Sequence, residues 1–555
     1  MNAPLAIPPT WTTGSTAVIK TGTWRAAIAS HISAPSPCHS ACPMHGEIAS
    51  WIGQARAGDT HGAWRTLSLH NPFPAVIGRI CHHPCETACN RAEVDGPLSI
   101  CKLERHVGDV ALQQGWQHEA PSADAQRGER VAVVGGGPSG LSAAYHLRRR
   151  GFAVTLFEAG AQLGGVMRDG IPGYRLARQV LDAEIERVLA LGIELRCNHA
   201  IATPEALAGL RAQFDAVYLA YGAKQPKRLA QLDYARPWAL DGADYLAQAN
   251  AGTPPPLGRR VVVIGGGSAA FDVARSARRA GHEVTMLALE AQAQLPAQHE
   301  ELEEAREEGI VLRDATQLCG VVETADAVRL DCRRVRFEPG ARPGEFALTP
   351  LADTAFQLEA DAIVSAIGQD PDLAPLAGVV PQQGKLAAID TFGATGSEGV
   401  WAGGDLASDA RFVSVAIGMG ERAALSIERW LDARASKAAA PPAEIGPTVA
   451  LQDINLHYHP ARPRAEAPRL AVAERLRSSA EVQLALDIEQ ALAEAARCFS
   501  CGTCTHCDNC ITYCPDLAVQ RLGAGYAVLA DYCKGCGLCV EECPTGSMTM
   551  LEEAK

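Results

Sequence analysis

The chain has 555 residues, of which 20% are charged, and a net charge of −13. This length exceeds what one hydrophobic core supports, so several domains are expected, and the acidic balance excludes a protein that binds nucleic acid through a basic surface. No run of eighteen apolar residues is present, and the first residues (MNAPLAIPPTWTTGS) lack the features of a signal peptide, which predicts a cytoplasmic protein without a membrane span.

The nineteen cysteines gather at the two ends of the chain. Six lie between residues 38 and 101, ten lie between 498 and 543, and Cys197, Cys319 and Cys332 stand apart. A reducing cytoplasm disfavours disulfides, so the pattern predicts two metal-binding ends around a metal-free middle. The three isolated cysteines are expected to be buried, small apolar residues.

Residues 1–125 are expected to form short helices and loops, and the middle of the chain then contains two strand–turn–helix–strand patterns. The first begins VAVVGGGPSG at residue 131, and the second begins VVVIGGGSAAFDVARSARRAG at residue 261. Apolar β-branched runs before the glycines and helical periodicity after them predict two Rossmann-like nucleotide-binding domains. DAIVSAIG (361–368) and GVWAGGD (399–405) are predicted to be further buried strands that return the chain to the first domain.

The first glycine turn has the spacing of a dinucleotide-binding site. Gly135 permits a tight turn, Gly137 lets a pyrophosphate approach the backbone, and Gly140 lets helix and strand pack closely. The N-terminus of the helix offers unpaired N–H groups to phosphates. Glu158, at the end of the second strand, is a candidate for accepting hydrogen bonds from ribose hydroxyls.

Several motifs together resemble the FAD domain of the glutamate synthase small-subunit family, which also includes the N-terminal part of dihydropyrimidine dehydrogenases. They are GGGPSGLSAAYHL, Glu158, GGVMRDGIPGYRL and WAGGDLAS. The resemblance extends over residues 20–435 and implies an FAD site with Asp405 on the ribityl chain and the helix at 416–418 aimed at the flavin ring. The residues that it places along the FAD are Gly164, Gly165, Gly170, Ile171, Pro172, Arg175, Gly403, Gly404 and Asp405.

Related disulfide reductases carry a redox cysteine pair after the acidic ribose residue, but this chain has QLGGVMRDG there, without a cysteine. A dithiol is therefore excluded as the acceptor of the flavin's electrons. Hydride transfer between a nicotinamide and a flavin needs stacking, orientation and electrostatics from the protein. No catalytic acid–base residues are predicted.

The second glycine turn, with Gly265, Gly267 and Ala270, resembles the nicotinamide domain of the same family. NADP-dependent members carry arginines after the second strand, whereas this chain has Leu289, Glu290 and Gln292. A carboxylate near the ribose favours a free 2′-hydroxyl and repels a phosphate, so NAD is predicted in preference to NADP. The arginines of the following helix are expected to form a solvated face, although one of them could still bind a 2′-phosphate: Arg275, Arg278 and Arg279.

The C-terminal cysteines form two runs of the pattern Cys-x2-Cys-x2-Cys-x3-Cys-Pro. This doubled pattern predicts a ferredoxin-like α+β domain with two [4Fe–4S] clusters, in which the fourth cysteine of each run binds the other cluster. Zinc also uses paired cysteines, but rarely in such triples. One predicted ligand set is Cys504, Cys507, Cys510 and Cys543, and the other is Cys514, Cys533, Cys536 and Cys539.

The N-terminal cysteines resemble a helical domain of the family that holds two [4Fe–4S] clusters, except that its initial A-R-C-x-x-C is missing. AARCFSC at residues 495–501 has that pattern. The family pattern then implies two ligand sets, with Glu104 as a reserve for Cys101: Cys38, Cys89, Cys498 and Cys501 in one, and Cys42, Cys81, Cys85 and Cys101 in the other. Alternatively, Cys498 and Cys501 are unused remnants, or they reach a second protomer.

These predictions combine into a multidomain α/β iron–sulfur flavoprotein that moves electrons between NAD(H) and a ferredoxin or a partner catalytic subunit, such as a 2-oxoacid oxidoreductase, within a hetero-oligomer. The alternatives are an NADPH-dependent glutamate synthase small subunit and an electron relay with a degenerate nicotinamide site. The predicted parts are the helical iron–sulfur domain 1–125, the FAD domain 126–257 and 366–435, the NAD domain 258–365, a linker and helix 436–497, and the ferredoxin-like domain 498–555.

Overall fold

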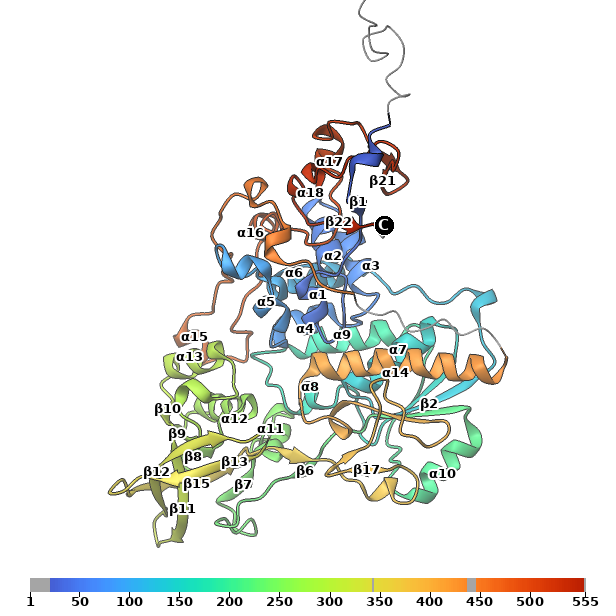
Figure 1. Ribbon diagram of the computed structural model, residues 1–555. Helices are drawn as coiled ribbons and strands as arrows, with labels where there is room; N and C mark the ends of the chain where they lie inside the picture. The colour runs from blue at the N-terminus through green and yellow to red at the C-terminus, as the bar shows by residue number, and fades with distance from the viewer. Residues whose placement is uncertain (1–19, 342–343, 437–445, 554–555) are drawn as a thin grey trace, which may run out of the picture.

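A computed structural model describes residues 20–341, 344–436 and 446–553 (Figure 1). The N-terminal stretch quoted above and residues 437–445 of the predicted linker lie outside the described residues. The described chain forms a helical N-terminal region, two parallel sheets with their helices, and a small C-terminal unit. The predicted multidomain α/β class is therefore confirmed.

The N-terminal region is built from short helices. Proline begins α1, α4 and α5, where its fixed φ suits the first helical turn and its missing N–H is not needed. Helices α4 and α6 cross so closely that a Cβ on Gly78 would lie only 2.3 Å from the Arg105 backbone nitrogen, so the crossing needs a glycine at this position. The bounds are α1 Pro37–Ala41, α2 Ile48–Arg56, α3 Thr60–Leu67, α4 Pro74–Ile80, α5 Pro84–Thr87 and α6 Ile100–Gln113.

The first sheet is parallel, with the strand order β19-β5-β2-β3-β4. Its apolar strands are buried between helices, and α14, which follows the last strand of this sheet along the chain, lies beside α7 (Figure 1). A Cβ on Gly420 would lie 2.4 Å from the Ser139 oxygen, so glycine allows this close helix packing. The bounds are β2 Arg130–Val134, α7 Pro138–Arg149, β3 Ala153–Phe157, α9 Arg178–Leu189, β4 Glu194–Arg196, β5 Ala216–Leu219, β19 Val400–Ala402 and α14 Val413–Arg434.

The second sheet is also parallel, with the order β10-β9-β8-β15-β7, and an antiparallel lobe of β11–β14 is inserted in the chain between β10 and β15. Strand β7 precedes residue 258, so the chain enters this sheet earlier than its glycine turn indicates. The bounds are β7 Ala239–Asp241, α11 Gly242–Asn250, β8 Arg260–Ile264, α12 Ser268–Arg279, β9 Glu283–Leu287, α13 His299–Glu307, β10 Val311–Arg313, β11 Thr316–Glu323, β12 Val328–Pro339, β13 Phe346–Pro350, β14 Phe356–Ala360 and β15 Ala362–Ser365.

Residues 446–501, here called the strap, cross several parts of the molecule. The strap contains two short helices, α15 (Val472–Arg475) and α16 (Ile488–Ala495), within the region 436–497 that is predicted to be a linker and a helix. Between them the chain is held by other segments, since Val482 donates its backbone N–H to the Tyr174 oxygen at 2.9 Å. Further contacts join this stretch to α13, through Arg475 and Glu307 at 2.6 Å, and to α4, through Glu481 and Arg79 at 2.7 Å.

The C-terminal unit contains a strand that the sequence does not predict. The strand β1 (Ala27–His31) pairs antiparallel with β22 (Met548–Glu552), so the two ends of the chain share one small sheet (Figure 1). AIASH is too short and too mixed in polarity to predict this long-range pairing. The other bounds of the unit are α17 Asn509–Thr512, β20 Val519–Leu522, β21 Gly525–Val528 and α18 Leu538–Glu541.

Candidate functional site: two nucleotide turns and four cysteine groups

The first glycine turn has the geometry of a phosphate cradle. Gly135 has φ +109°, and a Cβ there would lie 2.4 Å from the Ala220 oxygen. A Cβ on Gly140 would lie 1.9 Å from the Gly135 oxygen. Beside Gly137, in contrast, a Cβ would meet nothing nearer than the Gly165 Cα at 4.0 Å. The turn is thus closely packed on the protein side and open at the N-terminus of α7, which suits a pyrophosphate.

Glu158 is held at the end of β3 by backbone donors. Its carboxylate accepts hydrogen bonds from the N–H groups of Gly136 at 2.8 Å and Gly160 at 2.7 Å. Carboxylate oxygens have further lone pairs, so the group can also accept from a ribose. The Gly164 N–H donates to the Gly136 oxygen at 2.8 Å, which brings the second FAD-type motif, including Gly165, against the first.

The GGD motif lies beside the same helix. Gly404 has φ +64°, and a Cβ there would lie 3.0 Å from the Ser139 Cβ in the first turn of α7. Burial raises the pKa of Asp405 above its ordinary value, and the Asp405 carbonyl accepts a hydrogen bond from Arg411 at 2.6 Å. The structure therefore gathers these predicted FAD residues around one helix terminus.

Arg175 lies at the junction of the two nucleotide-binding domains. It forms ion pairs at 2.7 Å with Asp272 on α12 and at 2.7 Å with Glu301 on α13. Its guanidinium therefore binds the second domain to the GIPGYRL segment.

The second turn repeats the geometry of the first. Gly265 has φ +143°, and a Cβ there would lie 2.4 Å from the Ala366 oxygen, whereas beside Gly267 the nearest atom would be 4.0 Å away. A Cβ added to Gly265 would also lie 3.1 Å from the Cβ of Ala270. Glu290 follows β9, and one of its carboxylate oxygens lies 2.7 Å from the point that a Cβ on Gly266, the middle glycine of the turn, would occupy. Glu290 thus adjoins the turn as Glu158 does in the first domain.

The prediction of a solvated arginine face on α12 is wrong. Arg275 is 1% exposed and pairs with Glu304 at 2.6 Å and Glu308 at 2.8 Å. Arg279 pairs with Glu308 at 2.7 Å, and Arg278 donates to the backbone oxygen of Glu308 at 2.9 Å. Acidic residues on and after α13 neutralise these charges inside the domain, which helical periodicity alone does not reveal.

Four cysteines from opposite ends of one chain line a single cavity. We call this the shared cavity, and its cysteines are Cys38, Cys89, Cys498 and Cys501. Burial raises the pKa of the Cys38 thiol well above its usual range, and the other three thiols add to the effect. A cationic metal centre would reverse this shift by stabilising the thiolates.

Polar groups face three of these sulfurs, and one of them is the Ser36 hydroxyl, 3.1 Å from the Cys38 sulfur. The Ser500 N–H donates to the Cys498 sulfur at 3.4 Å, and the Asn90 side chain donates to the Cys501 sulfur at 3.5 Å. Such donors stabilise thiolates and are one means by which proteins tune iron–sulfur clusters. The lining of the shared cavity is therefore suited to a [4Fe–4S] cluster.

A second cavity, which we call the inner cavity, is lined by Cys42, Cys81, Cys85 and Glu104. Cys101 is not among its lining residues, because its thiol faces the backbone oxygens of α4 at 3.4 Å and 3.7 Å. Glu104 accepts a hydrogen bond from Asn71 at 2.7 Å, and burial raises its pKa to about 8. The inner cavity is therefore lined by Glu104, the reserve ligand of the sequence analysis, and not by Cys101.

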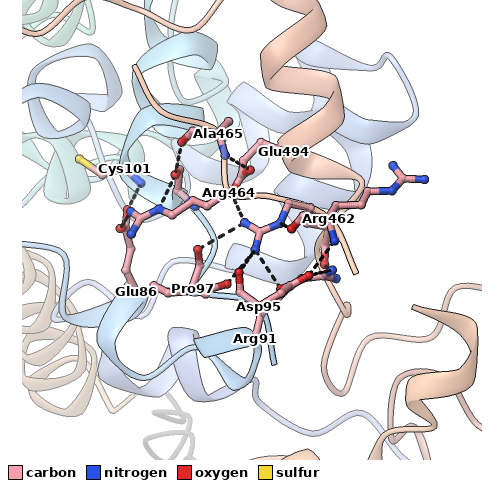
Figure 2. Close-up of polar contacts among 12 residues, drawn as sticks. Glu86, Arg91, Asp95, Pro97, Cys101, Arg462, Arg464, Ala465 and Glu494 are labelled. Atoms are coloured by element: carbon pink, nitrogen blue, oxygen red, sulfur yellow. Dashed lines mark hydrogen bonds and ion pairs between the residues drawn. The ribbon is translucent and has the colours of Figure 1, made fainter. Parts of the chain in front are cut away.

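A buried arginine anchors the strap next to the shared cavity, as Figure 2 shows for its partners. Arg497 is 1% exposed and pairs with Asp95 at 3.0 Å and Glu494 at 2.8 Å. It also donates to the backbone oxygens of residues 96 and 462 at 2.8 Å and 3.1 Å. Arg497 is quoted in the sequence analysis only as part of the AARCFSC motif. An arginine directly before a cysteine in an apolar segment is the signal that could have identified it as a buried anchor.

Further ion pairs and hydrogen bonds extend this network toward α5 and α6. Arg464 on the strap forms an ion pair with Glu86, and Glu86 accepts from the Cys101 N–H at 2.9 Å (Figure 2). Arg91 pairs with Asp95 at 2.6 Å and donates to the Arg497 oxygen. These contacts hold the cysteines of the strap against the N-terminal helices.

The ferredoxin-like unit groups its cysteines as two sets. Burial raises the pKa of Cys539 to about 11, and the neighbouring thiols of Cys514, Cys533 and Cys536 contribute. In the other set, burial raises the pKa of Cys510 to about 12, with contributions from Cys507, Cys504 and Cys543 and a smaller one from Cys539 of the first set. Three sulfurs accept backbone N–H groups at 3.2–3.5 Å: Cys504, Cys514 and Cys543.

The isolated cysteines differ from one another. Cys332 is 2% exposed, as expected, but Cys319 is exposed and Cys197 is only partly buried. Cys319 lies at an irregularity in the pairing of β11 with β12, which turns its side chain outward. Among the described residues, no group of three or more His, Cys, Asp or Glu side chains is arranged to hold a single metal ion. No helix in the described ranges is long and apolar enough to cross a membrane.

Comparison with known families assigns most of the chain. Residues 129–420 match the pyridine nucleotide-disulphide oxidoreductase family. Residues 31–116 match dihydropyrimidine dehydrogenase domain II, a 4Fe-4S cluster domain, and residues 526–549 match a 4Fe-4S binding domain. The three matches coincide with the nucleotide-binding sheets, the N-terminal helices and the C-terminal unit.

Curated relatives cover the same regions. The chain is 33% identical over 84% of its length to the NADP(+)-dependent formate dehydrogenase subunit beta of Moorella thermoacetica, and covers 70% of it. It is 30% identical over 71% of its length to the glutamate synthase [NADPH] small chain of Escherichia coli, covering 88%. It is 30% identical over 72% of its length to the NAD-dependent dihydropyrimidine dehydrogenase subunit PreT of the same species, covering 92%. The chain spans 64% of the length of two further relatives.

Proposed function

Because the chain belongs to the pyridine nucleotide-disulphide oxidoreductase family, with iron–sulfur domains at both ends, we propose that it moves electrons between NAD(H) and a partner protein through FAD and four [4Fe–4S] clusters. When bound, these groups supply hydride acceptance and one-electron transfer. The protein's part is to bind, orient and space them. The observation that carries the proposal is the lining of the shared cavity by cysteines from both ends of the chain.

The shared cavity is proposed to bind one cluster through Cys38, Cys89, Cys498 and Cys501 of the same chain. Changing both Cys498 and Cys501 to Ser should lower the iron content by about four per FAD. Cys319→Ser is the matched control, because this exposed cysteine lies in the antiparallel lobe. An unchanged iron content in the double variant would contradict the assignment, as would an equal loss in the control.

The inner cavity is proposed to bind a second cluster through Cys42, Cys81, Cys85 and Glu104. The lining residues support Glu104 over Cys101 as the fourth ligand. The C-terminal unit is proposed to bind two further clusters with the ligand sets predicted from the sequence, supported by the grouping of their thiols.

The residues around the glycine turns are proposed to bind the nucleotides. Gly135, Gly137, Gly140, Glu158, Gly164, Gly165, Gly404 and Asp405 would surround FAD, and Gly265, Gly267, Ala270 and Glu290 would surround NAD. Arg175 would act by holding the two domains together, since both of its ion pairs reach the second domain.

NAD is proposed over NADP because carboxylates lie just beyond the ends of β9 and β10. Glu290 adjoins the turn, and Asp314 accepts the backbone N–H of Gln292 at 2.9 Å. Two basic groups lie nearby: the exposed Arg306 donates to the Gln292 side chain at 2.5 Å, and Arg334 pairs with Asp314 at 3.6 Å. The relatives themselves differ, since two carry NADP or NADPH in their names and one carries NAD.

The preference can be tested with steady-state reduction of a viologen dye by NADH and by NADPH. NADH should be the better donor, and Glu290→Gln should raise kcat/KM for NADPH about tenfold by removing a like charge. Arg306→Ala should lower whatever NADPH activity remains. A wild-type preference for NADPH would contradict the proposal.

The partner is proposed to be a ferredoxin or a catalytic subunit of the same complex. The relatives include proteins named as subunits, such as the beta subunit of a formate dehydrogenase, which supports a hetero-oligomer. Proteins that co-purify with the chain would identify it. Anaerobic bleaching of the bound FAD by NADH separates this function from that of a relay with an inactive nicotinamide site, for which no bleaching is expected.

A further inference from the structure

Residues 468–484 of the strap form a closed loop, here called the brace loop. Its two sides pair with each other, because Leu470 donates its backbone N–H to the Val482 oxygen at 2.9 Å and Leu484 donates to the Pro468 oxygen at 2.9 Å. The short helix α15 lies between the two sides, next to α13 of the second nucleotide-binding domain (Figure 1). This part of the strap is therefore a closed element and not an extended linker.

The brace loop contacts α13 through its helix and through both of its sides. Arg475 on α15 is 4% exposed and pairs with Glu307, the last residue of α13, at 2.6 Å. Arg469, on the first side of the loop, pairs with the same carboxylate at 3.5 Å. The Gln483 side chain, on the second side, donates a hydrogen bond to Glu304, about one helical turn earlier on α13. The loop thus binds the C-terminal half of this helix.

The brace loop is attached at the same time to the FAD-type domain and to the N-terminal helices. Val482 donates its backbone N–H to the Tyr174 oxygen at 2.9 Å, and the Glu481 carboxylate accepts the backbone N–H of Ala177 at 3.0 Å. These two acceptor and donor groups lie in and directly after the GIPGYRL segment. Glu481 also pairs with the arginines of α4 and α6. The loop therefore bridges the second nucleotide-binding domain and the first.

The brace loop and Arg175 hold α13 near its opposite ends. Arg175 pairs with Glu301 in the first turn, whereas Arg475 pairs with Glu307 six residues later, about 9 Å along the helix axis. Contacts at one end of a helix limit its position but not its tilt, and a second contact at this separation limits the tilt as well. Hydride transfer depends on the mutual orientation of the two reacting groups, so a small displacement of one domain lowers the rate steeply.

We propose that the brace loop positions the second nucleotide-binding domain for hydride transfer from NADH to the FAD, with Arg475 as the positioning residue. The inference rests on the proposed function. Arg475 acts through α13 and takes no part in the transfer itself. Because the same strap carries Cys498 and Cys501 into the shared cavity, its docking serves both the entry of electrons from NADH and a cluster on their way out.

The test is the anaerobic stopped-flow reduction of the FAD by varied concentrations of NADH, in the purified and fully loaded protein. Arg475→Met should lower the rate constant at saturating NADH about tenfold and leave the half-saturating NADH concentration, the FAD content and the iron content unchanged. Arg475→Lys should restore most of the rate, because it keeps a cation beside Glu307. Arg477→Met, at an exposed position just after α15, is the matched control and should behave like the wild type.

A wild-type limiting rate in fully loaded Arg475→Met would overturn the inference, as would a higher half-saturating NADH concentration without a slower limiting rate. Equal losses in the Met and Lys variants would also overturn it, since the ion pair would then make no difference. If Arg475→Met loses FAD or iron, Glu307→Gln decides, because it changes a partly exposed residue outside the strap.

Glu307→Gln should lower the limiting rate while the FAD and iron contents stay unchanged, and an unchanged rate in this variant would overturn the inference. The proposed function has a separate outcome in the same experiment. A wild-type protein whose FAD is not reduced by NADH would contradict the proposed function, whatever the variants show.

Discussion

The inner and shared cavities differ in where their residues come from. The inner cavity takes all of its candidate ligands from one stretch between Cys42 and Glu104. The shared cavity takes two from the N-terminal helices and two from the strap. The first can form when the N-terminal region folds, whereas the second requires the far end of the chain to dock. The two cysteines of AARCFSC are close together in sequence, but their place in the shared cavity depends on the contacts that Arg497 makes with the N-terminal region.

The largest expected effect comes from breaking that anchor. Arg497→Met would leave the buried carboxylate of Glu494 and the partly buried carboxylate of Asp95 without their shared cation, at a cost of about 3 kcal/mol. We expect the strap to detach and the iron content to fall by about four per FAD, with the inner cavity unaffected. Iron analysis and limited proteolysis measure both effects.

Arg462→Met provides the control for the anchor. The Arg462 side chain is exposed, and only its backbone oxygen accepts from Arg497. This variant should keep its iron and its resistance to proteolysis. If Arg497→Met behaved like the control, the shared cavity would not depend on the buried network.

An intermediate effect is expected at the inner cavity. Glu104→Ala should lower the iron content and change the resonance signal of one cluster, because it removes a candidate ligand. Cys101→Ser should change neither, since the Cys101 thiol faces the backbone of α4. The opposite result would return Cys101 to the ligand set and make Glu104 a buried structural carboxyl.

The smallest effect tests whether the strap also supports the inner cavity. Glu481 on the strap pairs with Arg79 on α4 at 2.7 Å and with Arg105 on α6 at 2.7 Å. Glu481→Gln should destabilise this contact by about 2 kcal/mol, seen as a lower unfolding temperature and faster hydrogen exchange in residues 472–483. Glu466→Gln, at an exposed position on the same strap, should change neither.

The fold class and the two nucleotide turns could be predicted because their signals are local. Gly135 and Gly265 occupy backbone conformations that favour glycine, and each precedes a helix with regular periodicity. The same local reasoning was wrong for Arg275, whose acidic partners lie some thirty residues later, on and beyond α13. Helical periodicity describes one helix and cannot include a neighbour's charges.

The sequence by itself determined the cysteine patterns, the glycine turns and the family to which the chain belongs. Only the tertiary structure decided that Cys498 and Cys501 lie with Cys38 and Cys89, that Glu104 lines the inner cavity in place of Cys101, and that strand β1 completes the C-terminal unit. The physical reason is that spacing along the chain limits what neighbouring residues can bind, whereas contacts between its ends depend on buried partners such as those of Arg497.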